Sequence, residues 1–186
     1  PYLETFVGLL FNQATQPPAL PAYEADEIDF TNITSQAELG RIQTDPMLKY
    51  ELNTFTDFNA FYLTMNTYAG IFSDLRVRQA FSHAIDRDAI TRSALQGLAT
   101  PAYSMMPIGF PAANPALRTV QRFDPDLARQ KLAEAGYPDG KGFPPVEMWL
   151  RGGESGPTQD AMEGIQAMLK QNLGINIAVR NIERKI

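Results

Sequence analysis

The sequence predicts an α/β fold in which helices flank a mixed sheet. Short apolar runs of strand length alternate with longer segments that have the 3.6-residue period of helices, both near the start of the chain and near its end. Strands separated by helices tend to pair in parallel through crossover connections. The 186 residues are 44% hydrophobic and 20% charged. That length and composition suffice for one buried core, so we expect a single domain over residues 1–186.

The first third of the chain predicts strands and two short helices. Ser35 is a good N-cap with Glu38 three residues later, so a helix is expected from there to about Thr44. A shorter helix is expected over 19–25. The expected strands are 5–11, 28–30, 48–54 and 60–65.

The clearest helical pattern begins at Asp74. Five apolar residues follow at helical spacing on one broad face, which we expect to be buried. They are Leu75, Val77, Phe81, Ala84 and Ile85. A second helix is expected from Asp86 to about Leu95, ending at Gly97. Residues 98–122 are rich in proline and glycine and predict a long ordered loop.

The last third of the chain predicts a helix, a strand, a second helix and a final strand. Asp124 and Pro125 supply an N-cap and a first-turn proline, Leu127 and Leu132 form a buried stripe, and Gly136 ends the helix. The elements expected after it are a strand at 146–150, a helix at 157–173 that ends at Gly174, and a strand at 175–179.

Charge and composition exclude several classes of protein. The net charge of −5 and the scattered basic residues argue against nucleic acid as a partner. No run of about 18 apolar residues exists, so no segment is expected to span a bilayer. The absence of cysteine fits an oxidising compartment and a cytosol equally. Because the chain starts without a basic or apolar leader, any export signal is expected to lie outside it.

The residues offer no catalytic or metal-binding constellation, so we expect no enzyme activity, cofactor or metal. His83 is the only histidine, and packing in the core is the simpler role for it than ligand or proton chemistry. Asp86 and Asp88 flank Arg87 and could be paired acids. An i, i+2 pair faces different sides of a helix, however, so a cap and a salt bridge are the simpler interpretation.

Two short segments are the candidate ligand-binding residues. Asn66, Thr67 and Tyr68 follow an expected strand, and polar residues at a strand end commonly face a cleft. An Asn-Thr turn cap is the competing interpretation. Tyr103 and Met105 lie in the loop of 98–122 and could form an adaptable apolar surface toward a ligand, although packing in the core is the alternative.

Two long segments resemble a known family. The first, FSDLRVRQAFSHAIDRDAI, runs from Phe72 to Ile90, and the second, FDPDLARQKLAEAGYPDGKGFP, runs from Phe123 to Pro144. Further matching blocks are residues 23–29, 62–67 and 97–104. Together they resemble the extracytoplasmic solute-binding proteins of ABC importers, in the peptide, dipeptide and nickel-binding family 5. Where the family usually has glycine before Glu-Ile-Asp this chain has Asp26, a residue type that tolerates positive φ.

The resemblance implies a binding protein and no reaction. Members of this family have two lobes that close on a ligand, and the chain resembles most of the second lobe of such a periplasmic-binding-protein-like fold, as a fragment. The implied partners are a small peptide and an ABC permease, in a periplasmic or extracytoplasmic location tied to the membrane through the transporter. Alternatives are a nickel chelate or a sugar as ligand, or a hydrolase of small amides or glycans. A lobe without its partner would expose apolar surface and could self-associate.

Overall fold

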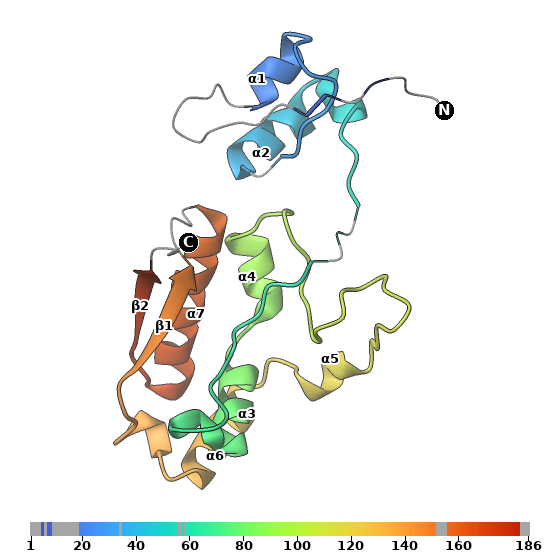
Figure 1. Ribbon diagram of the computed structural model, residues 1–186. Coiled ribbons are helices and arrows are strands. Elements are labelled where there is room, and N and C mark those ends of the chain that lie inside the picture. The colour runs from blue at the N-terminus through green and yellow to red at the C-terminus, as the bar shows by residue number, and fades with distance from the viewer. Residues whose placement is uncertain are drawn as a thin grey trace. The chain divides into compact units, whose positions relative to one another are not determined.

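The chain consists of two compact units, residues 1–51 and residues 52–186 (Figure 1). The computed structural model describes residues 5, 7–8, 19–33, 35–55, 57, 59–151 and 156–182. Each unit has its own buried side chains. That the whole chain of 186 residues is one domain remains a prediction from the sequence.

The first unit is built on two helices, α1 (Ala19–Glu24) and α2 (Gln36–Thr44), followed by the 3-10 turn η1 (Leu48–Tyr50). Ser35 caps α2 as expected, because its side chain accepts a hydrogen bond from the Glu38 backbone N–H at 3.5 Å. The buried apolar side chains described here are Leu20, Ala22, Leu39 and Ile42. Two of them lie on each helix.

The turn after α1 confirms the expectation for Asp26. Its φ is +58°, in the left-handed region that favours glycine and that aspartate tolerates. The backbone N–H of Asp26 donates to the Tyr23 carbonyl at 3.1 Å, and that of Glu27 donates to the Ala22 carbonyl at 2.9 Å. These bonds close the helix end, so the turn forms without a glycine.

The second unit combines helices with a small sheet. The four longer helices are α3 (Leu75–Ala84), α4 (Arg87–Ser93), α6 (Pro125–Glu134) and α7 (Pro157–Leu173), and the strands are β1 (Val146–Arg151) and β2 (Ile177–Ile182). Three short pieces complete it: η2 (Ile71–Ser73), α5 (Leu117–Val120) and η3 (Pro138–Gly140). Asp74, Asp86 and Asp124 each cap the helix that follows through a carboxylate that accepts a backbone N–H.

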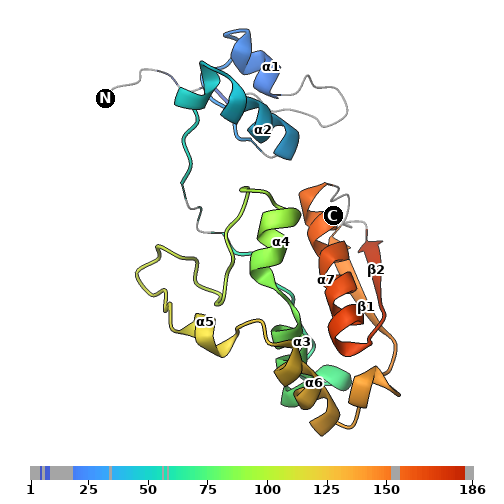
Figure 2. The same cartoon turned by 180° about the vertical axis from the view of Figure 1, so that it is seen from behind.

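The sheet of the described residues has two parallel strands, with Val146 opposite Ile177 and Leu150 opposite Asn181. Helix α7 makes the crossover and lies between the sheet and the α3–α4 pair (Figures 1 and 2). Leu150 and Ile177 are buried, whereas Trp149 is 62% exposed on the opposite face. The α/β class and the flanking helices are as the sequence predicts, and the described residues form one parallel pair of strands where a mixed sheet was expected.

The core of the second unit lies where α3, α6 and α7 meet. Val77, Leu132, Leu169 and Leu173 are each at most 1% exposed, and the rings of Phe72 and Phe81 pack edge to face with centroids 5.1 Å apart. Full burial of a leucine side chain stabilises the folded state by about 1.5–3 kcal/mol. The apolar stripes predicted from helical spacing therefore supply this core.

Helix α7 ends in close contact with the turn at η3. Gly174 has φ +71° and lies so close to the backbone of Asp139 that a Cβ there would stand 2.5 Å from the carbonyl oxygen. A Cβ on Gly140 would stand 2.7 Å from the Leu173 carbonyl oxygen. Glycine at both positions allows the two backbones to meet.

Several expected strands are wrong. Residues 28–30 and 60–65 do not form strands. The segment 48–54 begins with the 3-10 turn η1, because the Asp45 carboxylate accepts the backbone N–H groups of Met47 and Leu48. A strand needs a hydrogen-bonded neighbour, which alternation along a sequence does not supply. Most of the strand expected at 5–11 lies outside the described residues.

Smaller corrections concern helix faces and boundaries. Leu75 is 57% exposed, although its spacing predicted burial, because it stands in the first turn of α3. On α6, Leu127 was expected to be buried but is only partly buried, whereas its neighbour Ala128 is fully buried. The final strand covers 177–182 in place of 175–179, and α5 interrupts the loop of 98–122.

Candidate functional site

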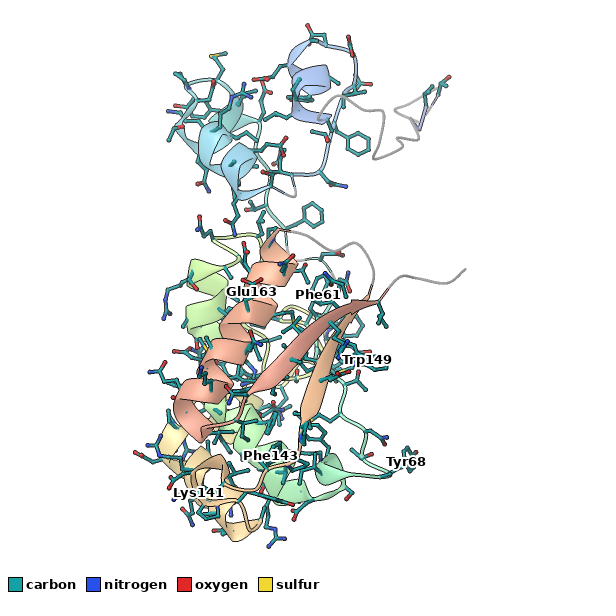
Figure 3. All side chains as sticks on the ribbon, turned by 90° about the vertical axis from the view of Figure 1, so that its left-hand side faces the viewer. Phe61, Tyr68, Lys141, Phe143, Trp149 and Glu163 are labelled. Atoms are coloured by element: carbon teal, nitrogen blue, oxygen red, sulfur yellow. The ribbon has the colours of Figure 1, made fainter. Side chains whose placement is uncertain are left out.

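The first candidate segment, residues 66–68, forms an exposed turn. The Asn66 side-chain oxygen accepts a hydrogen bond from the Tyr68 backbone N–H at 3.1 Å, which is the turn-capping alternative considered from the sequence. Tyr68 is 98% exposed, and Figure 3 shows its ring pointing away from the ribbon. Thr67 is also exposed. The turn thus leaves an aromatic ring free to contact a ligand.

The second candidate segment has one anchored residue and one exposed residue. The Tyr103 hydroxyl donates a hydrogen bond to the Asp88 carboxylate, and its ring lies under the guanidinium groups of Arg87 and Arg118, at 5.5 Å and 5.0 Å from the centroid. Met105 is 60% exposed. Tyr103 is therefore held by its neighbours, and Met105 is the residue of this pair that is available to a ligand.

Electrostatics around Tyr103 follow from these contacts. Burial, and then the hydrogen bond to Asp88, raise the pKa of Tyr103 above its ordinary value. The bond from Tyr103, together with the charge of Arg118 3.1 Å away, lowers the pKa of Asp88. The phenol stays neutral and the carboxylate stays charged at neutral pH, so the pair acts as a fixed hydrogen bond and not as an acid–base couple.

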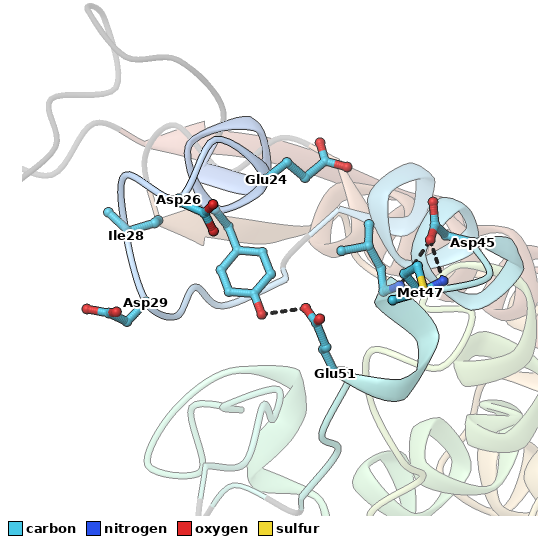
Figure 4. Close-up of a pocket in the computed structure, with 9 residues that line it drawn as sticks. Glu24, Asp26, Ile28, Asp29, Asp45, Met47 and Glu51 are labelled. Atoms are coloured by element: carbon cyan, nitrogen blue, oxygen red, sulfur yellow. Dashed lines mark hydrogen bonds between the residues drawn. The ribbon is translucent and has the colours of Figure 1, made fainter.

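A pocket that the sequence reasoning missed lies in the first unit, between the end of α1 and η1 (Figure 4). Its volume is about 580 Å³. Five of its nine lining residues are acidic: Glu24, Asp26, Asp29, Asp45 and Glu51. The density of acidic residues over 24–51 is the sequence signal that could have drawn attention to it.

Three of these five carboxylates have partners within the first unit. Glu51 accepts the Tyr23 hydroxyl at 2.6 Å, a bond that raises the pKa of Tyr23. Asp45 accepts the backbone N–H groups of Leu48 and Met47, which lower the pKa of that carboxyl. Glu24 pairs with Arg41. Within the described part of the chain, no group of three or more histidine, cysteine or acidic residues is arranged to hold a metal ion.

His83 is placed in the core. It is 8% exposed, and its Nδ1 lies 2.8 Å from the Arg122 backbone carbonyl. Packing is therefore the role that the structure gives this residue. Asp86 caps α4 through the Ala89 N–H at 2.9 Å, and Asp88 pairs with Arg118, so the acids beside Arg87 serve as the cap and the salt bridge that spacing favoured.

The helices described here include none that is both long enough and apolar enough to cross a membrane. The exposed aromatic side chains of the second unit include Phe61, Tyr62, Tyr68 and Trp149. Trp149, on β1, donates its indole N–H to Glu147 at 3.1 Å, and Glu147 in turn accepts from Arg180 at 2.7 Å. This polar chain fixes the orientation of the exposed indole.

Comparisons with known proteins agree along nearly the whole chain. Residues 3–185 match the family described as bacterial extracellular solute-binding proteins, family 5 Middle. A putative ABC transporter peptide-binding protein of Brucella ovis is 32% identical over 179 residues, which cover 95% of this chain and 33% of that protein. The heme-binding protein A of Haemophilus influenzae is 34% identical over 134 residues, which cover 72% of this chain and 23% of that protein.

Solved structures show the same fold. The murein tripeptide binding protein MppA of Escherichia coli has a TM-score of 0.69 and 27% identity, with 90% of this chain and 33% of that one covered. A periplasmic oligopeptide-binding protein of Borrelia burgdorferi has a TM-score of 0.63 and 27% identity over 89% of this chain and 32% of that one. The chain therefore spans about a third of these proteins or less.

Proposed function

The chain belongs to family 5 of the bacterial extracellular solute-binding proteins, and we propose on that basis that it is most of the second lobe of a binding protein that delivers peptides to an ABC importer. The observation that carries the proposal is the match over residues 3–185, together with likeness to two peptide-binding structures at 27% identity. The relative from Brucella is also named as a peptide-binding protein.

The geometry supports capture of a solute more than catalysis. His83 is buried and bonded to a backbone carbonyl, so it is not placed to activate a nucleophile. The same burial speaks against His83 as an axial ligand of haem, the ligand for which the Haemophilus relative is named. A hydrolase of amides or glycans needs paired carboxylates or a serine with a base, and Asp86 and Asp88 serve other contacts.

In this proposal the ligand is held between two lobes. Closing the lobes on a peptide shifts the population toward the closed form, which a membrane permease then recognises. Asn66, Thr67, Tyr68, Tyr103 and Met105 remain the proposed ligand-facing residues of this lobe, with Tyr68 and Met105 as direct contacts because both side chains are exposed. The location is extracytoplasmic, beside the transporter.

Native mass spectrometry tests the proposal. The 186-residue chain and the longer two-lobed protein that the proposal implies are purified gently and examined for bound small molecules. Peptide masses on the longer protein and none on the chain alone support a half-site on this lobe. A haem, sugar or nickel chelate on the longer protein would replace the peptide assignment, and a ligand held tightly by the chain alone would overturn the half-site.

Self-association of the chain is a separate prediction. Exposed apolar side chains such as Trp149 at 62% and Phe61 at 79% would favour it (Figure 3). Sedimentation velocity over a range of chain concentrations measures it directly. A concentration-independent monomer would contradict the prediction.

A further inference from the structure

The loop of 98–122 is tied to helices α3 and α4 near both of its ends. It projects from these helices on the side away from the sheet (Figures 1 and 2). Near its start, Tyr103 donates to Asp88 at the beginning of α4. Near its end, the Arg122 carbonyl lies 2.8 Å from His83 Nδ1. A segment with two fixed ends has far fewer conformations than a free loop of the same length.

A single side chain, Arg87, takes part in both attachments. Its Nη1 donates to the carbonyl oxygens of Ser82 at 3.1 Å and Gln121 at 3.2 Å, and its Nη2 donates to the Ser82 hydroxyl at 3.1 Å and the Gln121 side-chain oxygen at 3.3 Å. The same guanidinium lies over the Tyr103 ring. A planar group with five donors can serve both ends at once, whereas a lysine ammonium is a point charge with three donors and lacks this forked geometry.

The cation is held in place by its surroundings. Arg87 is partly buried, and desolvation lowers the pKa of its guanidinium group. An arginine remains charged under these conditions. Because hydrogen bonds from a charged donor are stronger than neutral ones, the loss of this group would weaken both attachments together.

Between the two attachments lies an apolar tip. Met105 is 60% exposed, Ile108 is 62% exposed, and Met106 and Phe110 are each 37% exposed. Short turns shape it, since the Phe110 N–H donates to the Pro107 carbonyl at 3.1 Å and the Ala113 N–H donates to the Phe110 carbonyl at 2.9 Å. Methionine is flexible and polarizable, so such a surface adapts to different apolar side chains.

We propose that Arg87 is a positioning residue that fastens both ends of the loop at 98–122 and so presents the tip at 105–110 to an apolar side chain of the bound peptide. The identity of what the tip contacts rests on the proposed function. The fastening itself is independent of it and can be measured on the 186-residue chain. Arg87 acts through the loop and does not touch the solute.

Hydrogen exchange of the loop amides tests the fastening. In Arg87→Met we expect the amides of Phe110, Ala113 and Leu117 to exchange about tenfold faster than in the unchanged chain, since several charged hydrogen bonds are lost. Arg92→Met is the matched control, because Arg92 is an exposed arginine on the same helix, and it should leave these rates unchanged. Equal loop exchange in the Arg87 and Arg92 variants would overturn the proposal.

Two further variants cover the case in which Arg87→Met loses its fold. Arg87→Lys keeps the charge over Tyr103 without the forked donors, so we expect loop exchange between that of the unchanged chain and that of Arg87→Met. Tyr103→Phe keeps the ring and removes the bond to Asp88, so only the start of the loop should loosen. If every variant speeds core and loop amides alike, Arg87 is a general structural residue and the proposal is wrong.

Peptide-binding measurements test the contact made by the tip at 105–110 separately from the proposed peptide-binding function. In the longer two-lobed protein, Arg87→Lys should weaken the affinity for a peptide with a large apolar side chain about threefold to tenfold, because fewer molecules hold the loop in the competent form. A Gly-only peptide of equal length should be affected less. If the unchanged protein binds no peptide, the proposed function fails while the exchange result stands. If Arg87→Lys loosens the loop and peptide affinity is unchanged, the tip is not a solute contact.

Discussion

The two compact units differ in both core and charge. In residues 1–51, eight acidic residues stand against two basic ones, a net charge of −6, whereas residues 52–186 carry thirteen acidic and fourteen basic residues, a net charge of +1. The described core of the first unit has four buried apolar side chains, and that of the second has a cluster of twelve. Most of the buried apolar side chains of the described residues therefore lie in the second unit.

This difference indicates where folding stability resides. A unit of about 50 residues buries too small a fraction of its surface to be robust by itself, and repulsion among unbalanced charges opposes a compact state. The second unit has the size and the neutrality of an ordinary stable domain.

The largest expected effect is the removal of a core leucine. Leu132→Ala should lower the free energy of unfolding by about 2–5 kcal/mol, since Leu132 is fully buried among α3, α6 and α7. Urea unfolding followed by the fluorescence of Trp149, which stands in the same unit, measures it. The matched change Leu39→Ala, at a site 7% exposed in the first unit, should leave that transition in place and speed amide exchange within residues 19–51. Equal shifts of the Trp149 transition would show that the units unfold together.

Glycine substitutions should act in opposite directions in the two units. Gly174→Ala should destabilise the second unit by roughly 1–3 kcal/mol for its positive φ alone, before the clash with Asp139 is added. Gly142 also has a positive φ of +75°, but an added Cβ there would have no atom within 4 Å, so Gly142→Ala measures the cost of the positive φ without a clash. Gly40→Ala, inside α2 with nothing within 4 Å, should stabilise the first unit by about 0.5–1 kcal/mol. Melting temperatures and amide exchange report both effects. A stable Gly174→Ala chain would mean that α7 and η3 can separate at little cost.

Helix caps give a smaller difference. Asp124 accepts the Leu127 N–H at 3.0 Å, so Asp124→Ala should lower the stability of the second unit by about 1 kcal/mol. Ser35 accepts the Glu38 N–H at the longer distance of 3.5 Å, and Ser35→Ala should cost less. Asp124→Asn keeps the cap and removes the ion pair with Arg122, so it separates the two contributions. A larger loss at Ser35 than at Asp124 would contradict the expected order.

The smallest effect is the titration of exposed caps in acid. Hydrogen bonds from Arg76 lower the pKa of Asp74 to about 2 from 3.8. A carboxyl whose folded pKa is lowered stabilises the fold above its unfolded pKa, and this contribution is lost as the pH falls from about 4 to about 2. In the first unit, the hydrogen bonds from the Leu48 and Met47 N–H groups lower the pKa of Asp45. Because this pKa is also lowered, ionised Asp45 stabilises the fold in the same way, and that contribution is likewise lost in acid. Carbon-13 NMR of the carboxyl groups checks both, and an Asp74 pKa near 4 would rule out the expected bond to Arg76.

Local signals in the sequence were reliable for helices. Ser35 and Asp124 were predicted to be N-caps from residue type and spacing, and the helix predicted to begin at Asp74 does so. Gly136 and Gly174 take the positive φ of helix ends. These features depend on contacts within a few residues, which the sequence itself displays. Periodicity likewise predicted helix α7 and the strands before and after it, β1 and β2.

Strands and sites were harder because they depend on distant residues. In the alternating segment 60–65, Leu63 and Met65 pack against the core, as their spacing predicted. The segment nevertheless forms no strand. The place of Tyr103 in its loop predicted a ligand-facing residue but did not predict its hydrogen bond to Asp88 or the two guanidinium groups over its ring, because these come from residues distant in sequence. The acidic pocket of the first unit forms between segments that are separate in sequence, so residue spacing gave no picture of it.

The sequence by itself determined the α/β class, the helix ends and the family, since these follow from short-range periodicity, capping and ordered motifs. The tertiary structure alone decided the division into two units, the use of Arg87 by both ends of one loop, and which candidate residues are exposed. The physical reason is the range of the interactions. A cap or a helical stripe is fixed by neighbours within about four residues, whereas burial and side-chain pairing depend on which distant segments meet.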